Sequence, residues 1–429
     1  MGVSWACLSL FALFLTPFPL LVTAQPEPAY GYLPVNSPIS WTSIEPTGDF
    51  YKPNEGIILA SKNFSNLQDG SSACSCGFIY NQTCKSSLFV ISTTHSYASH
   101  LALQNGANVL WSINPNKPVR YNATLKLTSE RGLVLQDADG TIAWSTNIGN
   151  RSVAGLILTD TCNLKLMDEN NATIWQSFDH PTDTLVLGQK LGAGKQLTSK
   201  GGLFSLSLKT RGLFAYIDSQ LYLIINPSGM YYDISYVQFR NQTLAFFNQS
   251  SKLIGELEAF STSPMKYVRL ESDGHLRAYD DYWNQGYPGY DVFTQYIDGG
   301  ESGDCTYPTI CGNYSVCSEG QCSCPPPING KSYFQRIDDR LPNRGCSPVT
   351  ALSCEASKNH ILLELKNITY FPFSNNKGLA GLSPEIYAFI DPDYQHMTLE
   401  NCTHACLKNC SCKAAIYDSS SILGNSISV

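Results

Sequence analysis

Hydrophobic and polar positions repeat along part of this chain at a fixed offset of 31 residues. Two successive copies share their leucine, threonine, aspartate and tryptophan positions: Leu125, Leu127, Thr128, Leu133, Leu135, Asp137 and Trp144 recur as Leu156, Leu158, Thr159, Leu164, Leu166, Asp168 and Trp175. A third, weaker copy ends at residues 109–114. Each copy has two short alternating runs joined by a polar turn, so it buries one face only when a neighbouring copy covers it. The repeat therefore predicts a small all-β body of three copies around a shared axis.

The repeated tryptophans Trp111, Trp144 and Trp175 suit two roles, stacking on sugar rings or forming a core. Their fixed position within each copy favours a shared core. A body of this kind offers turns and edges for binding, and the pattern indicates no place for chemistry.

Alternation continues beyond the repeat, in residues 204–208, 221–225 and 267–280. In the last of these, Asp273-Gly274 separates two strand-like runs, which predicts a hairpin. A second β unit without helices is therefore expected. Residues 25–50, rich in Pro, Tyr and Ser, show no sustained period and predict an extended arm or an irregular first strand.

The first residues have the pattern of a secretory leader. An apolar stretch runs from Trp5 to Val22 and is followed by small residues up to Ala24, although a basic residue near Met1 is missing. We expect residues 1–24 to be removed. No later apolar run approaches the roughly 20 residues that cross a bilayer, so a secreted, extracellular (apoplastic) protein without a membrane span is expected.

Eleven Asn-x-Ser/Thr sites support passage through the secretory pathway. Nine are expected to carry glycans: Asn63, Asn81, Asn122, Asn150, Asn171, Asn241, Asn248, Asn313 and Asn367. Asn401 and Asn409 precede cysteines and are weaker candidates. Charged residues make up 15% of the chain and the net charge is −7 without a basic cluster, which argues against nucleic acid or an anionic membrane as a partner.

Most of the 16 cysteines lie from Cys305 onward. Six of them fall within residues 305–346, where so few apolar residues occur that cross-links must hold the segment together. Sequence alone allows 15 pairings of six cysteines. Farther on, Cys402, Cys406 and Cys410 are four residues apart, which predicts one face of a short helix. No metal ligand set and no cofactor motif is expected.

Together the tryptophan repeats, residues 173–185 (TIWQSFDHPTDTL), residues 267–280, the cysteine run 305–324 and the tail CTHACLKNCSC resemble the extracellular region of plant S-domain (G-type, bulb-type lectin) receptor kinases. The resemblance implies a bulb-type lectin β-prism over 51–190 and an S-locus-like β domain over 191–300. It also implies an EGF-like module over 301–347 and a partial PAN/apple-like module over 348–429. The membrane span and kinase of that family lie outside this sequence, which contains no kinase motif.

The resemblance also implies disulfides: Cys305–Cys317, Cys311–Cys322, Cys324–Cys346, Cys406–Cys412, Cys354–Cys410 and Cys76–Cys84. Without Cys7 of the leader, 15 cysteines remain, so at least one stays free or pairs with another molecule. Cys402 is the candidate, because related tails close it with a later cysteine.

Bulb lectins bind mannose through Gln-x-Asp-x-Asn-x-Val-x-Tyr on a strand, because alternate side chains share one face. The best-matching stretches hold Thr128, Glu130, Gly132, Val134 and Gln136 in one copy and Thr159, Thr161, Asn163, Lys165 and Met167 in the next. Only Asn163 matches a polar family position, and Cys162 replaces the usual preceding glycine. The implied ligand-binding candidates are Thr128, Glu130, Gln136, Thr159, Thr161 and Asn163, in a weakened mannose motif.

Three hypotheses of function follow. The favoured one is a secreted, non-enzymatic recognition glycoprotein that binds a glycan or an extracellular protein, and that pairs as homo- or heterodimer with related ectodomains as decoy or co-receptor. The alternative is a truncated product of a receptor Ser/Thr kinase gene involved in cell-surface signalling. A secreted hydrolase is remote, since Asp179, His180 and Asp183 lack a nucleophile nearby and suit a turn better.

Overall fold

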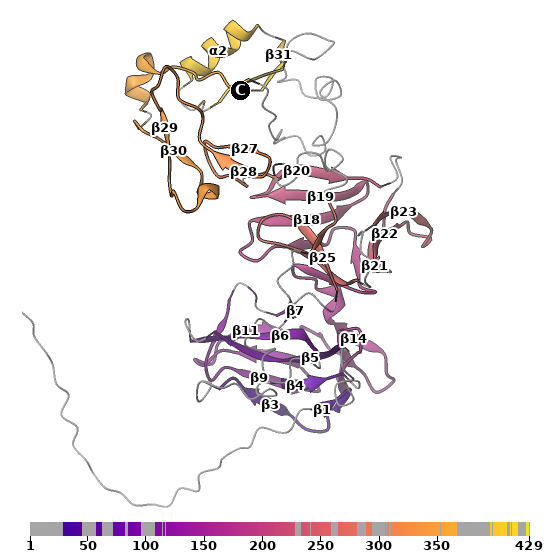
Figure 1. Ribbon diagram of the computed structural model, residues 1–429. Coiled ribbons are helices and arrows are strands. Elements are labelled where there is room, and N and C mark those ends of the chain that lie inside the picture. Colours follow the sequence, from indigo (N-terminus) through magenta and orange to yellow (C-terminus); the bar gives the residue numbers. More distant parts are fainter. Residues whose placement is uncertain are drawn as a thin grey trace, which may run out of the picture.

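The computed structural model describes residues 29–44, 57–61, 72–81, 85–95, 108–113, 115, 117–227, 233–240, 242–258, 265–280, 289–293, 305, 307–308, 310–351, 353–366, 395–396, 398–409, 412, 414–418 and 426–428. They form two successive three-sheet bodies, a small disulfide-rich module and a C-terminal helix with a short sheet (Figure 1). The predicted all-β fold class is confirmed.

The first body consists of three sheets, each of which we name after its consecutive strands. The β4–β7 sheet contains β1 (Ala29–Tyr30), β4 (Ile57–Ala60), β5 (Ser72–Asn81), β6 (Ser86–His95), β7 (Asn108–Ser112) and β8 (Val119–Arg120). The β9–β11 sheet contains β3 (Ile39–Thr42), β9 (Thr124–Thr128), β10 (Gly132–Gln136) and β11 (Ile142–Ser145). The β12–β14 sheet contains β2 (Tyr32–Pro34), β12 (Gly155–Leu158), β13 (Leu164–Met167) and β14 (Thr173–Gln176).

Each sheet contributes one tryptophan to the centre of this body. Trp111 of β7, Trp144 of β11 and Trp175 of β14 contact one another edge to face, with ring centroids 5.7–6.3 Å apart. The leucines of the repeat line the same core. Because alternate residues of a strand share a face, the inward leucines and the tryptophan of each copy meet those of its neighbours. The predicted shared core is confirmed.

The repeat also explains the hairpins that join its strands. Asp137 and Asp168 begin equivalent turns, in which the carbonyl group of each accepts a hydrogen bond from the backbone NH three residues later, at Gly140 and Asn171. Both of these later residues have a positive φ, +88° and +60°, which glycine and asparagine adopt most readily. Equal offsets in sequence thus correspond to equal backbone geometry.

Residues 29–42 are part of the first body. β1, β2 and β3 follow one another in the chain, yet each joins a different sheet: β1 pairs with β4, β2 with β12 and β3 with β9. Of the two predicted alternatives for this segment, the extended arm is wrong for these residues, since they form short irregular strands. Single strands of two to four residues show too little alternation to be recognised in sequence.

The second body repeats the three-sheet plan without a sequence repeat. Its first sheet contains β15 (Thr184–Val186), β24 (Met265–Leu270), β25 (Leu276–Asp280) and β26 (Tyr290–Asp291). Its second sheet contains β16 (Lys190–Gly192), β21 (Tyr236–Arg240), β22 (Thr243–Phe247) and β23 (Leu253–Glu258). Its third sheet contains β17 (Gln196–Thr198), β18 (Phe204–Lys209), β19 (Gly212–Ile217) and β20 (Gln220–Ile225). Once more three successive strands, β15 to β17, open three different sheets. Since β15 and β16 pair with β24 and β21, this body begins at Thr184 instead of residue 191. The hairpin at Asp273-Gly274 is confirmed between β24 and β25.

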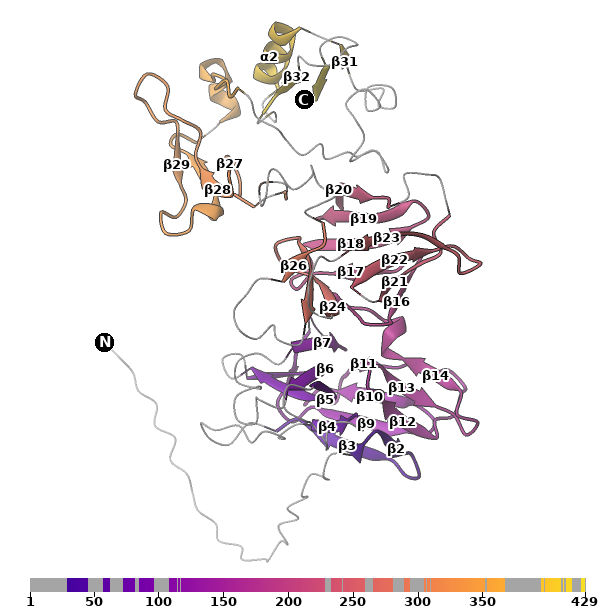
Figure 2. The same ribbon diagram turned by 45° about the vertical axis from the view of Figure 1, so that its right-hand side comes forward.

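The two bodies contact each other through β7, β15, β24 and β25, and both views show β7 next to the second body (Figure 2). Arg269 of β24 donates hydrogen bonds to the Val109 carbonyl of β7 and, at 3.1 Å, to Thr184 Oγ1. The stacked rings of Tyr267 and Tyr279 pack with the core of the first body. Residues of the second body therefore complete one end of the first.

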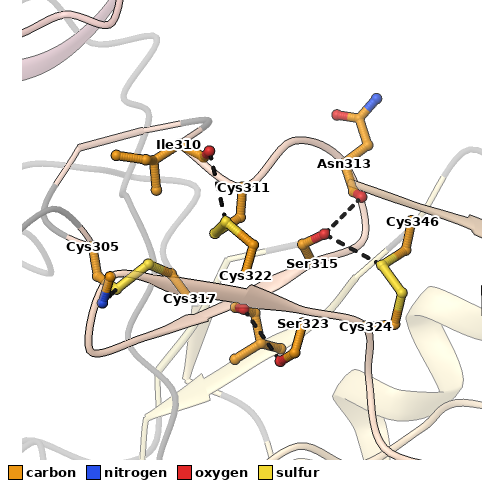
Figure 3. Close-up of a disulfide and its surroundings, with 12 residues drawn as sticks. Cys305, Ile310, Cys311, Asn313, Ser315, Cys317, Cys322, Ser323, Cys324 and Cys346 are labelled. Carbon is orange, nitrogen blue, oxygen red and sulfur yellow. Dashed lines mark hydrogen bonds between the residues drawn. A yellow bond between two sulfur atoms is a disulfide. The ribbon is translucent and has the colours of Figure 1, made fainter. Parts of the chain in front are cut away.

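The disulfide-rich module holds a two-stranded hairpin, β27 (Val316–Ser318) and β28 (Gln321–Ser323), and a second pair, β29 (Phe334–Arg336) and β30 (Cys346–Pro348). Figure 3 shows its three disulfides, Cys305–Cys317, Cys311–Cys322 and Cys324–Cys346. These are the pairings that the family resemblance implied. Short 3-10 helices, η7 (Pro342–Arg344) and η8 (Cys354–Asn359), lie within and after the module.

The C-terminal part contains helix α2 (Leu399–Lys408) and a sheet of β31 (Gln395–His396), β33 (Ser426–Ser428) and β32 (Ile416–Asp418). Thr398 caps the helix by accepting a hydrogen bond from the Asn401 NH. Cys402 and Cys406 are buried on one face of α2; Cys406 bonds Cys412, and Cys402 is a free thiol, as expected for the odd cysteine. Cys354 is also disulfide-bonded, while its expected partner Cys410 lies outside the described residues.

Candidate functional site

The outward side chains of the first body form its candidate binding faces, because the inward ones are used by the core. Along β9 and β10 the inward positions are Leu125, Leu127, Leu133 and Leu135. The residues between them point outward, as strand geometry requires. The predicted ligand-binding positions belong to these outward rows or to the turns at their ends.

Thr128, Glu130 and Gln136 do not come together in the structure. Thr128 and Glu130 lie at the turn between β9 and β10, where Thr128 Oγ1 accepts from the Arg131 NH and Glu130 accepts from the Ser129 hydroxyl, which lowers the pKa of Glu130. Gln136 lies at the other end of β10, and the rise of a strand places it about 13 Å from this turn. Its side chain accepts from Lys126 Nζ at 3.0 Å and donates to the Gly140 carbonyl.

Thr159, Thr161 and Asn163 do come together, but they bond mainly to one another and to adjacent residues. Thr159 Oγ1 lies 3.0 Å from Thr161 Oγ1 and accepts from the Asn163 NH. Asn163 is only 5% exposed. Its amide donates to Gln176 Oε1 at 2.9 Å, and its carbonyl oxygen accepts from the Ser177 hydroxyl. The one family-matching polar residue is thus part of an internal network that ties β13 to β14, and sugar binding by these six residues stays a prediction.

The outer face of the β12–β14 sheet holds a different arrangement, which the sequence did not reveal. Outward side chains form two rows across this sheet. One row consists of Tyr32, Ile157, Lys165 and Gln176, and the other of Pro34, Gly155, Met167 and Thr173. The Tyr32 ring lies over Gly155, where a Cβ atom would come within 2.3 Å of the ring. Tyr32 nevertheless remains 44% exposed. Sequence reasoning missed Tyr32 because it belongs to the segment interpreted as an arm.

Lys165 stands two strands from Tyr32 on this outer face. Its ammonium group forms no hydrogen bond or ion pair with any of the described residues. Gln176, next to it, donates to Asp179 at 3.0 Å. The face therefore presents an aromatic ring on β2 and an unpaired cation on β13, with Ile157 of β12 between their backbone positions.

The segment between the two bodies has a structural role. The Trp111 indole NH donates to the His180 carbonyl at 2.6 Å, and the His180 ring stacks on Trp175. Burial lowers the pKa of His180, and Lys195 adds to this effect. Asp183 accepts hydrogen bonds from the hydroxyls of Thr182 and Thr184. These contacts fit the turn hypothesis. Nowhere in the described ranges do three or more His, Cys, Asp or Glu side chains gather as a metal site.

The cysteines of the first body differ from the prediction. Cys74 of β5 bonds Cys162, in the turn between β12 and β13, and so joins two of the three sheets. Cys76, expected to pair with Cys84, is a free, buried thiol whose pKa burial raises to about 12. The Cys76–Cys84 prediction is wrong because Cys76 lies inside the core, hydrogen-bonded to Leu59. Cys84 lies outside the described residues.

Comparison with known proteins identifies two domain families in this chain. Residues 108–206 match the family "D-mannose binding lectin", and residues 386–426 match the "PAN-like domain". No helix within the described ranges has the length and apolarity of a membrane span.

Three relatives illustrate the similarity. A G-type lectin S-receptor-like serine/threonine-protein kinase of Arabidopsis thaliana is 29% identical over 77% of this chain and 37% of its own length. EP1-like glycoprotein 2 of Arabidopsis thaliana is 27% identical over 72% of this chain and 73% of its own. The epidermis-specific secreted glycoprotein EP1 of Daucus carota is 27% identical over 66% of this chain and 81% of its own.

Among solved structures, the two-domain Scilla campanulata agglutinin aligns with 40% of this chain and 78% of its own, at 17% identity and a TM-score of 0.21. The chain spans little more than a third of the receptor kinase and about three quarters of EP1-like glycoprotein 2. It thus contains a bulb-type lectin domain and a PAN-like domain, and is related to the plant G-type lectin S-receptor-like kinases and the EP1-like glycoproteins.

Proposed function

We propose that this chain is a non-enzymatic extracellular recognition glycoprotein whose first body binds glycans. The observation that carries the proposal is the arrangement of the first body itself. Its tryptophans and leucines are used in the core, while rigid strands present polar and aromatic side chains outward. Rigid outward faces suit recognition, since little side-chain freedom is lost when a ligand binds.

Secretion is part of this proposal. Disulfides that join distant segments form and persist in oxidising compartments. Among the expected glycosylation sites, Asn122, Asn150, Asn171 and Asn313 are exposed and thus accessible to a glycan. The relative from Daucus carota is itself described as a secreted glycoprotein.

A glycan array probed with the secreted, disulfide-intact protein tests the function. We expect a reproducible set of bound glycans, confirmed by titration calorimetry. Protein unfolded by reduction serves as the control for non-specific adhesion. Absence of any glycan binding at micromolar concentration by folded protein would contradict the proposal.

We further propose that the EGF-like and PAN-like modules pair with related receptor ectodomains, so that the protein acts as a decoy or co-receptor. This proposal is supported by the separation of these modules from the lectin body: they follow it in the chain and are cross-linked by disulfides of their own. Analytical ultracentrifugation of the protein with a G-type lectin receptor ectodomain measures association. A mixture that sediments as two independent species at micromolar concentration excludes the pairing and leaves glycan binding untouched.

A further inference from the structure

We propose that the outer face of the β12–β14 sheet is a subsite for an acidic sugar, in which Tyr32 stacks on the pyranose ring and Lys165 pairs with the carboxylate of a uronate residue. The inference rests on the proposed glycan binding of the first body. It assigns a ligand class and residues that differ from those of the mannose motif.

The Tyr32 ring is a preformed platform. Leu33, its neighbour on β2, pairs with Leu156 of β12 and so fixes the backbone of Tyr32. The ring occupies the space that a side chain on Gly155 would fill, and its hydroxyl lies 3.4 Å from the Ala154 carbonyl. An exposed aromatic ring held in one orientation stacks on the apolar face of a sugar with little loss of freedom.

Lys165 supplies the charge that selects an acid. Two strand spacings separate it from Tyr32, about 10 Å between backbones, and the Tyr32 ring covers the first of them by lying over Gly155 of β12. A lysine stem of four methylene groups is long and flexible enough for its ammonium group to reach a sugar acid seated on the ring. Since no described residue pairs with its ammonium group, a ligand carboxylate does not have to displace a protein partner. A charge-assisted hydrogen bond of this kind is stronger than one to a neutral hydroxyl.

The equivalent face of the β9–β11 sheet lacks both features. Ser40 holds the place of Tyr32, so this face has no aromatic ring at that position. Thr124 holds the place of Gly155, so a side chain stands where the ring would lie. Val134 holds the place of Lys165, whereas the lysine of this face, Lys126, stands at the position of Ile157 and is hydrogen-bonded to Gln136. The two copies thus provide a test face and a matched control face within one molecule.

Titration calorimetry on the full secreted chain tests the proposal with four probes: trigalacturonate, its methyl ester, mannotriose and a tetraglutamate peptide. We expect trigalacturonate to bind and its methyl ester to bind about tenfold more weakly, because the ester carries no charge. Lys165→Gln should abolish this preference. Tyr32→Ala should weaken the binding of trigalacturonate and of its methyl ester about tenfold. Tyr32→Phe should bind both ligands as the parent protein does, because it keeps the ring.

Gly155→Ala removes no polar group but displaces the Tyr32 ring, so it should reproduce Tyr32→Ala. The controls Ser40→Ala and Lys126→Gln should bind as the parent does. Thermal unfolding verifies that each variant is folded.

The possible outcomes separate this inference from the proposed function. Unchanged trigalacturonate affinity in folded Tyr32→Ala and Lys165→Gln overturns the subsite. Binding of the peptide but not of trigalacturonate also overturns it and indicates a protein ligand. If mannotriose or another array glycan binds independently of both residues, the subsite is wrong while glycan recognition stands. If no glycan binds at all, both proposals are wrong.

Discussion

The first and second bodies share one strand plan, yet different contacts close them. In each, three successive short strands, β1 to β3 or β15 to β17, open three separate sheets that later hairpins complete. The first body closes on three edge-to-face indoles and a disulfide between two sheets. The second closes on Phe and Leu side chains and on Tyr307 of the disulfide-rich module. The plan thus requires alternating burial on three sheets, whereas the central contacts are interchangeable.

Tyr307 brings a polar contact into the second body. Its hydroxyl lies 2.9 and 2.7 Å from the two carboxylate oxygens of Asp291, and its ring stacks on His275. His275 Nδ1 lies 2.6 Å from Asp291 Oδ2. The disulfide-rich module is thereby anchored in the second body, whereas the first body is closed by its own residues and by apolar rings from its neighbour.

The largest expected difference between the bodies concerns the indoles. Trp175→Ala should lower the free energy of unfolding of the first body by about 3 to 5 kcal/mol, because it leaves a cavity between two remaining rings. Urea unfolding followed by tryptophan fluorescence measures this, since Trp41, Trp111 and Trp144 also lie in this body. Hydrogen exchange of β18–β22 should change little. Equal loss of protection in both bodies would show that they unfold as one unit.

The cross-sheet disulfide is expected to contribute slightly less. Cys74→Ala with Cys162→Ala should cost about 2 to 4 kcal/mol, because the bond closes a long loop in the unfolded chain. The matched control is Cys76→Ala, two residues along the same strand, which removes a buried thiol without opening a loop. Chemical unfolding under non-reducing conditions compares them. Similar costs for both variants would assign the stabilisation to packing alone.

In the second body, Asp291→Asn should cost about 1.5 to 3 kcal/mol at neutral pH, because Tyr307 and His275 lose a charged acceptor. Burial acts to raise the pKa of Asp291, but hydrogen bonds from His275 and Tyr307 hold it below its ordinary value. A lowered folded pKa means that the stabilisation is present above the unfolded pKa, about 3.9, and is lost as pH falls through the folded pKa.

The stability of the parent protein should therefore approach that of Asp291→Asn below about pH 4. Unfolding curves from pH 7 to pH 2, read by hydrogen exchange in β24–β26, measure the difference. Glu256→Gln, which alters a solvent-exposed pair with Arg240 elsewhere in the same body, is the control and should change stability by less than about 1 kcal/mol. A constant difference between parent and Asp291→Asn over the whole pH range contradicts the assignment.

Sequence reasoning succeeded where one residue type fills three equivalent positions. The tryptophans and leucines of the repeat revealed the first core, and Asp273-Gly274 revealed a hairpin, since both signals are local. The second three-sheet body escaped recognition because Phe, Leu and Val replace one another freely in a core and leave no repeat. The strands β1 to β3 escaped because their partners lie far away in sequence.

The candidate site shows the same limit. Matching residues to a strand motif identified Asn163, but only coordinates reveal that Gln176 and Ser177 occupy its hydrogen-bonding atoms. Tyr32 and Gly155 are more than a hundred residues apart in sequence, and their contact depends on the β2–β12 pairing. Cys74–Cys162 likewise joins a strand of one sheet to a turn of another. A single sequence carries no signal for contacts of this kind.

The smallest expected effect compares two turns within the first body. Gly140 and Asn171 hold equivalent positions with positive φ, and a Cβ atom on Gly140 would meet nothing closer than 3.6 Å. Gly140→Ala should therefore cost only the backbone strain, about 1 kcal/mol, whereas Asn171→Gly should change stability by a few tenths at most. Thermal unfolding of enzymatically deglycosylated protein measures both, because Asn171 is also an expected glycan site. If Gly140→Ala is neutral, the turns of the two copies are not equivalent in solution, and the repeat specifies the shared core without specifying its connections.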